Sequence, residues 1–506
     1  MTNALDRAIA YFSPAAAVRR AQMRRVLGYY EAGRKDNQRK QRRSLGSGNA
    51  EVRRAGRALR DQARHLEENH DLATGILNIL VANIAGPNGV TIEPQPRTRS
   101  GEIHQELSKQ INAVMRDWVK RPEVTWRHDW PGAQRIACRS WVRDGEMLSQ
   151  LVTGNLRTLD HGTRVPFSLE LLESDYLPMD MDDAGKGIIQ GVEVNAWGRA
   201  VAYHLYKQHP GDVYRAFVGR GVDTKRVQAG NVLHLAMRHR LHQVRGVSVF
   251  APVLARLDDL KDYEESERIA AKVAASMAAA IKKGAPDDYS NSLDDDGDPE
   301  ARDLRFRPGM IFDDLRPGED IVTIDSNRPN PNLPDHRKGQ LRAVASGTYC
   351  SHSSVAKDYD GTYSAQRQEL VESWGVYGIL QSEFIGQFVR PVYESLISAA
   401  VASGQLLIPA DVDGQSLDDA LFLAPQMPWI DPDKEAKAWE RMEKNGHASG
   451  PEIIRRRGRN PADVLEQEST WREQWRGKGE VITADPANEQ SQQETTDEQT
   501  GVELAN

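Results

Sequence analysis

Cysteine is scarce in this chain of 506 residues, which has only Cys138 and Cys350. Two cysteines without metal-ligand spacing cannot build a disulfide framework or a zinc site, so we expect a protein of a reducing compartment. Long hydrophobic runs are also missing. No stretch approaches 18 uninterrupted apolar residues, so we expect no transmembrane helix. The N-terminus has no continuous apolar core, which argues against a secretory signal. These absences predict a soluble protein made in a cytoplasm.

Motifs that carry chemistry are missing as well. The chain has no GxxxxGK[ST] nucleotide loop, no GxSxG elbow and no HExxH pair. His204, His234 and His242 lack the spacing of metal ligands, so we interpret them as structural. The sequence therefore predicts no enzyme, no cofactor and no metal site. One enzymatic alternative stays open, a nuclease with a metal site at Asp294, Asp296 and Asp298, although Pro299 stands where a calcium loop needs glycine.

The net charge of −7 hides strong segregation of charge. Residues 1–60 carry fifteen Lys and Arg against four acids, and residues 480–506 carry seven acids and no Lys or Arg. We interpret 1–60 as a basic arm and 479–506 as a disordered acidic tail. The arm is suited to neutralising DNA phosphates. A solvated or partner-bound helix explains it equally well.

Hydrophobic periodicity predicts a mainly helical α+β protein. Apolar residues recur at helical spacing over 50–85 and again over 102–119, with a strand at 90–93 between them. From Leu148 to Leu235 the period changes to two, and the clearest hairpin joins 191–194 to 200–206. We expect four clustered tryptophans to lie in the core rather than to stack on bases: Trp118, Trp126, Trp130 and Trp141.

The longest predicted helix runs from Pro252 to about residue 283, far beyond the usual 11–12 residues. We interpret it as a structural strut. Its first half is acidic, with Asp258, Asp259, Asp262, Glu264 and Glu265. This charge has a simple alternative explanation, because carboxylates near a helix N-terminus favour the helix dipole.

Four further elements follow. The acidic loop 284–304 includes Asp294, Asp295 and Asp296; a helix is expected over 336–348, a polar loop over 349–363, and a long helix over 364–400 that Pro391 kinks. Near the C-terminus, a helix at 432–445 and a second one after Pro451 resemble a helix-turn-helix, with Arg455, Arg456, Arg457 and Arg459 available for phosphate. A helical hairpin without DNA is the alternative.

Four segments, taken in order and with their spacing, carry a resemblance to a known family. They are LVANIAGPNGVTIEPQP at 80–96; Asp144-Gly145-Glu146 with VPFSLELLESDYL and the run 191–212; RVQAGNVLHL with RGVSVFAPVLARLDDLKDYEESERIAAKVAA at 226–275; and APQMPWIDPDKEAKAW with RRGRNPADVLEQ at 424–467. Together they resemble the lambda-type portal proteins of tailed phages. One departure is GTYCSHSSVAKDYDGTYS, where the family pattern is similar to GVSYEQL-x-GDYS.

The resemblance implies a portal fold that closes into a ring of about twelve copies through heterologous contacts. It implies these parts: basic arm 1–60, wing 61–251, stem helix 252–283, clip 284–332, second stem helix 333–349, tunnel loop 350–363, wing helix 364–402, crown 403–478 and acidic tail 479–506.

The function that the resemblance implies is a channel at one capsid vertex for packaging and ejection of double-stranded DNA. The implied partners are the large terminase subunit, the capsid or scaffold protein and a head-completion protein, with no membrane, in the virion and, during assembly, the host cytoplasm. Lys282, Lys283, His352 and Lys357 are then candidate DNA contacts in the channel, and the acids of stem and clip form a repulsive wall. The main alternative is a DNA-binding protein that forms no ring and uses the basic arm and the C-terminal helix pair.

Overall fold

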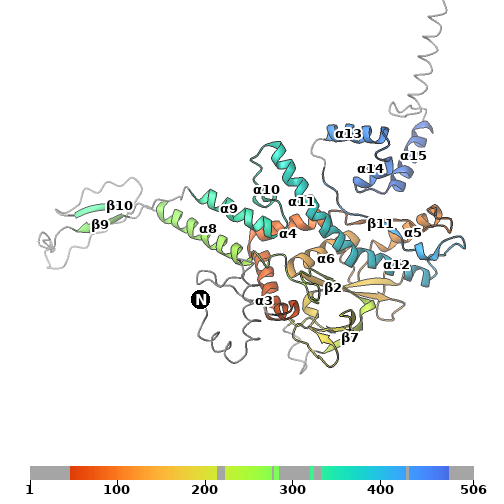
Figure 1. The fold of residues 1–506 in the computed structure, drawn as a ribbon, viewed down its shortest axis with the longest axis horizontal. Helices are drawn as coiled ribbons and strands as arrows, with labels where there is room; N and C mark the ends of the chain where they lie inside the picture. The colour runs from red at the N-terminus through yellow and green to blue at the C-terminus, as the bar shows by residue number, and fades with distance from the viewer. Residues whose placement is uncertain are drawn as a thin grey trace, which may run out of the picture. The chain divides into compact units, whose positions relative to one another are not determined.

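The computed structural model of the chain describes residues 46–212, 223–275, 279–283, 319–323, 332–428 and 432–477 (Figure 1). Residues 1–50 form one unit, described from Gly46 onward, and residues 51–506 form another. Most of the predicted basic arm, the acidic tail and Asp294, Asp295 and Asp296 lie outside the described residues.

The helix predicted over 50–85 is two helices, α3 (Gly48–Asn69) and α4 (Asp71–Ile84). His70 separates them with an extended backbone, and its Nδ1 accepts a hydrogen bond from the Leu72 N–H at 3.3 Å. Thr74 Oγ1 donates to the carbonyl of Glu67 at 2.6 Å. The prediction of one helix was wrong because the apolar residues keep helical spacing on both sides of His70, so the periodicity does not reveal the cap between the two helices.

Two helices and a two-stranded ladder follow. α5 (Gln105–Trp118) and α6 (Trp130–Asp144) pack near β1 (Thr91–Pro94), which pairs with β11 (Ala420–Leu423) from the far end of the chain. Trp118, Trp130 and Trp141 are buried, as predicted, and Trp118 Nε1 donates to the Phe167 carbonyl at 3.0 Å. Trp126 is 43% exposed, so the prediction of a core residue was wrong there. It lies under Arg121, whose guanidinium carbon is 4.7 Å from the centre of the ring.

The β-rich module between the helices consists of two antiparallel sheets, as its period of two predicts. The first has the order β3-β2-β8, with β2 (Glu146–Thr153), β3 (Phe167–Leu172) and β8 (Val232–Ala236). The second has the order β4-β5-β6-β7, with β4 (Ile188–Ile189), β5 (Val192–Val194), β6 (Ala200–Tyr206) and β7 (Thr224–Gln228). The predicted hairpin is confirmed as β5 and β6. Short 3-10 turns lie at Ser174–Tyr176, Ala229–Asn231 and Gly414–Ser416.

The predicted strut is shorter than expected. α8 (Leu254–Ala275) is helical, but Ala279–Lys283 form strand β9, paired antiparallel with β10 (Glu319–Thr323). The prediction of helix to about residue 283 was therefore wrong. Alanine has the highest helix propensity, but tertiary contacts can override propensity, and here residues 279–283 pair with the β-branched segment Ile321–Thr323.

The remaining helices are α9 (Leu333–Gly347), α10 (His352–Ala356), α11 (Tyr363–Phe384), α12 (Arg390–Ala402), α13 (Pro432–Lys444), α14 (Gly450–Arg456) and α15 (Pro461–Gly477). Of these helices, α9, α11, α12, α13 and α14 lie close to predicted positions, whereas α10 and α15 were not predicted. A π-helical segment, Ile385–Val389, joins α11 to α12 just before Pro391. A missing proline N–H commonly causes such local changes in a helix. None of the described helices is long and apolar enough to cross a bilayer. The fold is mainly helical α+β, as predicted.

Candidate channel-lining elements

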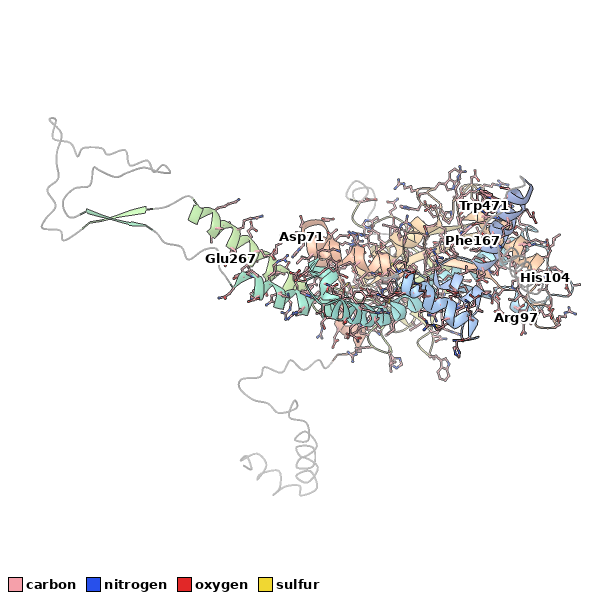
Figure 2. The ribbon with its side chains drawn as sticks, turned by 90° about the horizontal axis from the view of Figure 1, so that it is seen from above. Asp71, Arg97, His104, Phe167, Glu267 and Trp471 are labelled. Atoms are coloured by element: carbon pink, nitrogen blue, oxygen red, sulfur yellow. The ribbon has the colours of Figure 1, made fainter. Side chains whose placement is uncertain are left out.

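α8 and α9 form an antiparallel pair (Figures 1 and 2). Leu257, Leu260, Leu341 and Val344 belong to one buried cluster, and a Cβ on Gly347 would lie 2.5 Å from Val253 Cγ1. Farther along, the rings of Tyr263 and His336 meet edge to face at 5.2 Å. The contacts run in opposite chain directions, so the second helix returns along the first.

The acids of α8 divide into paired and unpaired carboxylates. Glu264 accepts from Arg337 Nε at 2.6 Å, and Glu265 lies 3.6 Å from Arg268. Asp258, Asp259 and Asp262 are exposed and have no ion pair among the described residues. These three carboxylates start beyond the first turn of α8, which holds no acid. Because the helix-dipole effect fades within the first turn, it does not account for this acidic stripe.

The segment predicted as an open polar loop, 350–363, contains α10 and is tied to its surroundings. Ser353 N donates to Glu369 at 3.1 Å, and Val355 is buried. Asp358 lies 3.3 Å from Lys338 Nζ, and the hydrogen bond from the Asp360 N–H, together with Lys338, lowers the pKa of Asp358. The prediction of an irregular loop was wrong for His352–Ala356. A Ser351 cap, which accepts from the Ser354 N–H at 3.3 Å, begins the helix.

The predicted channel cations lie on two separate elements. His352 opens α10 and is half-buried, and its buried Nε2 has no hydrogen-bond partner in the described part of the chain. Lys357 follows α10 in a left-handed conformation with φ 54°, is exposed, and has no ion pair among the described residues. Lys282 and Lys283 lie in β9, in register with Asp320 and Glu319. Asp294, Asp295 and Asp296 lie outside the described ranges.

Sequence reasoning missed a cation on the helix pair. Arg342 of α9 is exposed and has no ion pair within the described part of the chain. The sequence signal for Arg342 is a basic residue next to the apolar Leu341 and about one helical turn after Arg337 and Lys338. Arg337 and Lys338 form ion pairs with Glu264 and Asp358, whereas Arg342 forms none with any described residue.

The C-terminal helices do not support the helix-turn-helix interpretation. Arg455 makes a bidentate pair with Glu93 of β1, both contacts at 2.9 Å. Arg456 pairs with Glu452 and lies over the Trp439 ring, and Arg459 donates to Gln467. α14, the second helix of the predicted pair, has only 7 residues. The arginines proposed for phosphate thus have partners within the chain, and the helix is too short for a recognition helix.

One group of possible metal ligands occurs among the described residues, Glu173, Asp175 and His209, whose ligand atoms lie within 4.8 Å of one another. The Asp175 carboxylate is already paired with Arg60 at 3.2 Å and Arg64 at 2.5 Å. The two guanidiniums supply the positive charge that a cation would bring. We interpret the group as part of an ion-pair network that joins α3 to the turn at Ser174–Tyr176.

Comparisons with known proteins agree on one family. The family described as "Phage portal protein, lambda family" matches residues 34–381. A probable portal protein of Halomonas phage phiHAP-1 is 24% identical over 423 residues, which cover 81% of this chain and 79% of the relative.

Three solved structures similar to this chain come from gene transfer agent particles. A chain from the virion of the native particle is 12% identical, with a TM-score of 0.43, over 82% of this chain and 94% of that one. A chain from the native neck, computed with C12 symmetry, is 13% identical, with a TM-score of 0.42, over 80% of this chain and 92% of that one. A chain from the empty neck, computed with C6 symmetry, is also 13% identical, with a TM-score of 0.45, over 81% of this chain and 94% of that one.

Proposed function

Because the chain belongs to the lambda family of phage portal proteins, we propose that about twelve copies close into a ring at one capsid vertex. Double-stranded DNA passes through its centre during packaging and ejection. The observation that carries this proposal within the chain is the antiparallel α8–α9 pair with its stripe of exposed acids, Asp258, Asp259 and Asp262, which have no ion pair among the described residues. DNA that must slide is best served by a wall that does not hold phosphates.

In this proposal the parts keep their order along the chain. α8 and α9 are the stem, and the β9–β10 ladder belongs to the clip (284–332), which therefore begins nearer residue 279. The segment 350–363 is the tunnel loop, α11 and α12 join residues 61–251 in the wing, and residues 403–478 form the crown. The protein acts as a structural part of the virion, after assembly in the host cytoplasm, and catalyses no reaction. The large terminase subunit, the capsid or scaffold protein and a head-completion protein are its partners.

The few lumen cations that we propose are Lys282, Lys283 and Lys357, with His352 beside them. Reversing the charge of the three lysines together is expected to alter DNA packaging, since they would be the attractive contacts in an otherwise acidic passage. Unchanged packaging in a triple Lys→Glu variant would show that these lysines have no such role.

Light scattering on the purified chain, together with negative-stain images, tests the ring directly. We expect particles of about twelve times the chain mass with a central hole in end-on views. A monomer or dimer that binds duplex DNA with a steep salt dependence would support the alternative DNA-binding protein instead.

A further inference from the structure

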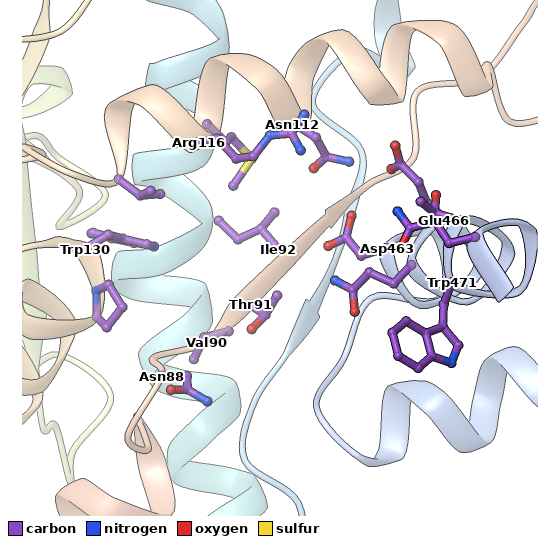
Figure 3. A pocket seen from close by; sticks show the side chains of 16 residues that line it. Asn88, Val90, Thr91, Ile92, Asn112, Arg116, Trp130, Asp463, Glu466 and Trp471 are labelled. Carbon is purple, nitrogen blue, oxygen red and sulfur yellow. The ribbon is translucent and has the colours of Figure 1, made fainter. Parts of the chain in front are cut away.

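An open groove separates α15 from α5 and β1 (Figure 3). Its volume is about 740 Å³. Asn112, Met115 and Arg116 of α5, with Val119 just after the helix, line one wall at the spacing of a single helix face. Asp463, Glu466 and Trp471 of α15 line the other, and Val90 and Ile92 lie between the two walls. We call this space the α5/α15 groove.

Several groups in this groove lack the partners that their chemistry calls for. Trp130 lines it and is 4% exposed, and its buried indole N–H has no hydrogen-bond acceptor among the described residues. Arg116, Asp463 and Glu466 have no ion pair among the described residues, and Trp471 is 52% exposed. The groove is thus apolar at its base and charged at both rims, and the charged side chains at its rims have no ion-pair partners among the described residues.

The opposite flank of α5 carries an apolar projection. Gln110, Ala113, Val114 and Asp117 lie on the side of the helix roughly opposite the groove-lining residues, given about 3.6 residues per turn. The segment after α12 lies against this flank and exposes Leu407 at 75% and Ile408 at 43%. It is held in place, because Leu406 is buried and its N–H donates to the Ala400 carbonyl at 3.1 Å. Two large aliphatic side chains are therefore presented to solvent by a fixed turn.

The charges around the two surfaces are complementary. Asp411, with its side chain 66% exposed, follows the projection, and Arg164, 67% exposed, lies on the same flank. The groove offers Arg116 on one rim and Asp463 and Glu466 on the other. A heterologous ring contact needs two different surfaces on opposite sides of each copy. The two flanks of α5 supply such a pair.

We propose that the Leu407–Ile408 projection of one copy inserts into the α5/α15 groove of the next copy. This inference rests on the proposed ring and adds to it a named contact between neighbours. Burial of the two aliphatic side chains stabilises the contact.

Cysteine cross-linking between copies tests this contact. Two variants, Leu407→Cys and Asn112→Cys, are mixed, assembled and treated with a short bismaleimide. The native thiols give little background, because Cys138 is 0% and Cys350 8% exposed, and burial raises the pKa of Cys350 to about 12. We expect a covalent dimer from the mixture and none from either variant alone. A mixture of Leu241→Cys with Asn112→Cys is the matched control, since Leu241 is an exposed leucine in another turn.

A second variant measures the strength of the contact without chemistry. Leu407→Glu is expected to raise the chain concentration at half-assembly about tenfold, whereas Leu241→Glu leaves it unchanged. A ring that forms normally but gives no more dimer than the control, or assembles equally well with Leu407→Glu, overturns this contact and leaves the portal function standing. An unmodified chain that never forms a ring overturns both.

Discussion

At the scale of single residues, the most constrained group is the buried carboxylate of Glu146. Arg245 Nη2 donates to its Oε1 at 2.5 Å, His234 Nε2 lies 3.0 Å from its Oε2, and the Gly246 N–H donates to the same oxygen at 2.8 Å. Arg245 also donates to the carbonyls of Leu177 and Gln190, both at 3.1 Å. Burial alone would raise the pKa of Glu146, but the charge of Arg245 and these hydrogen bonds lower it instead. The cluster fixes the segment that leads into α8.

Glu146→Gln should therefore destabilise the chain by about 3–5 kcal/mol, because it leaves the Arg245 guanidinium buried without its counter-charge. Chemical denaturation monitored by circular dichroism measures this. Glu193→Gln is the matched control: Glu193 also forms a two-point pair with an arginine, Arg226, but on an exposed sheet surface, where water screens the charges. Equal losses for the two variants would contradict the role given to burial.

His234 predicts how stability depends on pH. Burial lowers the pKa of His234, although Glu146 acts in the opposite direction, so the folded chain holds this ring neutral. In the unfolded chain, His234 has a pKa of about 6.5 and therefore takes up a proton at a higher pH than it does in the folded chain. The contribution of His234 to the free energy of unfolding is complete above about pH 6.5 and declines as the pH falls. The contribution of Glu146 declines in the same direction, below about pH 4.3.

In thermal melting between about pH 7 and pH 5, the melting temperature of the unmodified chain should thus fall more steeply than that of His234→Gln. The variant removes the titrating ring and keeps an N–H donor for Glu146. The exposed His447→Gln serves as the control and should melt with the slope of the unmodified chain. Parallel slopes for His234→Gln and the unmodified chain would show that the ring does not titrate on unfolding.

The sequence predicted that His234 is structural, and the structure confirms it. The reason could not be predicted, since Glu146 and Arg245 lie 88 and 11 positions away and nothing local marks them as partners. The same holds for Asp258, Asp259 and Asp262. Their acidic character is readable from the sequence, but the difference from Glu264 comes from Arg337, which only the packing of α9 against α8 brings near.

At the scale of elements, α14 is fastened to the rest of the chain by one strong polar contact. Arg455 holds Glu93, which is 9% exposed on β1, while α13 and α14 have no buried residues of their own. Arg455→Ala is expected to release the C-terminal helices and to speed their proteolytic removal several-fold, with little change in the melting of the remaining chain. Arg456→Ala removes a pair within α14 and a ring contact with Trp439 of α13 but leaves the contact with β1, so it should not.

Proteolysis followed by mass spectrometry distinguishes these outcomes. Cleavage near residues 424–432 that is faster in Arg455→Ala than in Arg456→Ala supports the contact with β1 as the fastening point. Equal rates in the two variants would mean that other contacts hold α14 in place.

Elements were predicted best where local pattern and tertiary contact agree. The β5–β6 hairpin and α9 follow from turn residues and periodicity within the segment itself. β9 does not, because Ala279–Lys283 continue an alanine-rich helical pattern, and only the distant β10 makes them a strand. β1 was predicted as a strand, yet its partner β11 lies more than 300 positions away, beyond the reach of any local signal.

At the scale of the whole molecule, the charge of α8 distinguishes a channel wall from an ordinary solvated surface. Replacing Asp258, Asp259 and Asp262 by asparagine leaves shape and packing intact, because all three are exposed and unpaired among the described residues. If they face DNA in the proposed ring, the triple variant should bind duplex DNA more tightly, since three repulsive charges per copy are removed. The gain should be large at low salt and shrink near 1 M, where the screening length is about 3 Å.

Fluorescence anisotropy of a labelled duplex with the assembled ring measures this change across a salt series. The control is a variant with the same loss of charge on exposed acids away from the α8–α9 pair, Asp61→Asn, Glu102→Gln and Glu106→Gln. Long-range attraction from the lower net charge alone would raise the affinity of both variants equally. A gain confined to the α8 variant requires proximity, because a charge farther away than about 10 Å is screened at about 0.1 M salt. The difference between the two variants, rather than either affinity, therefore decides whether α8 faces DNA.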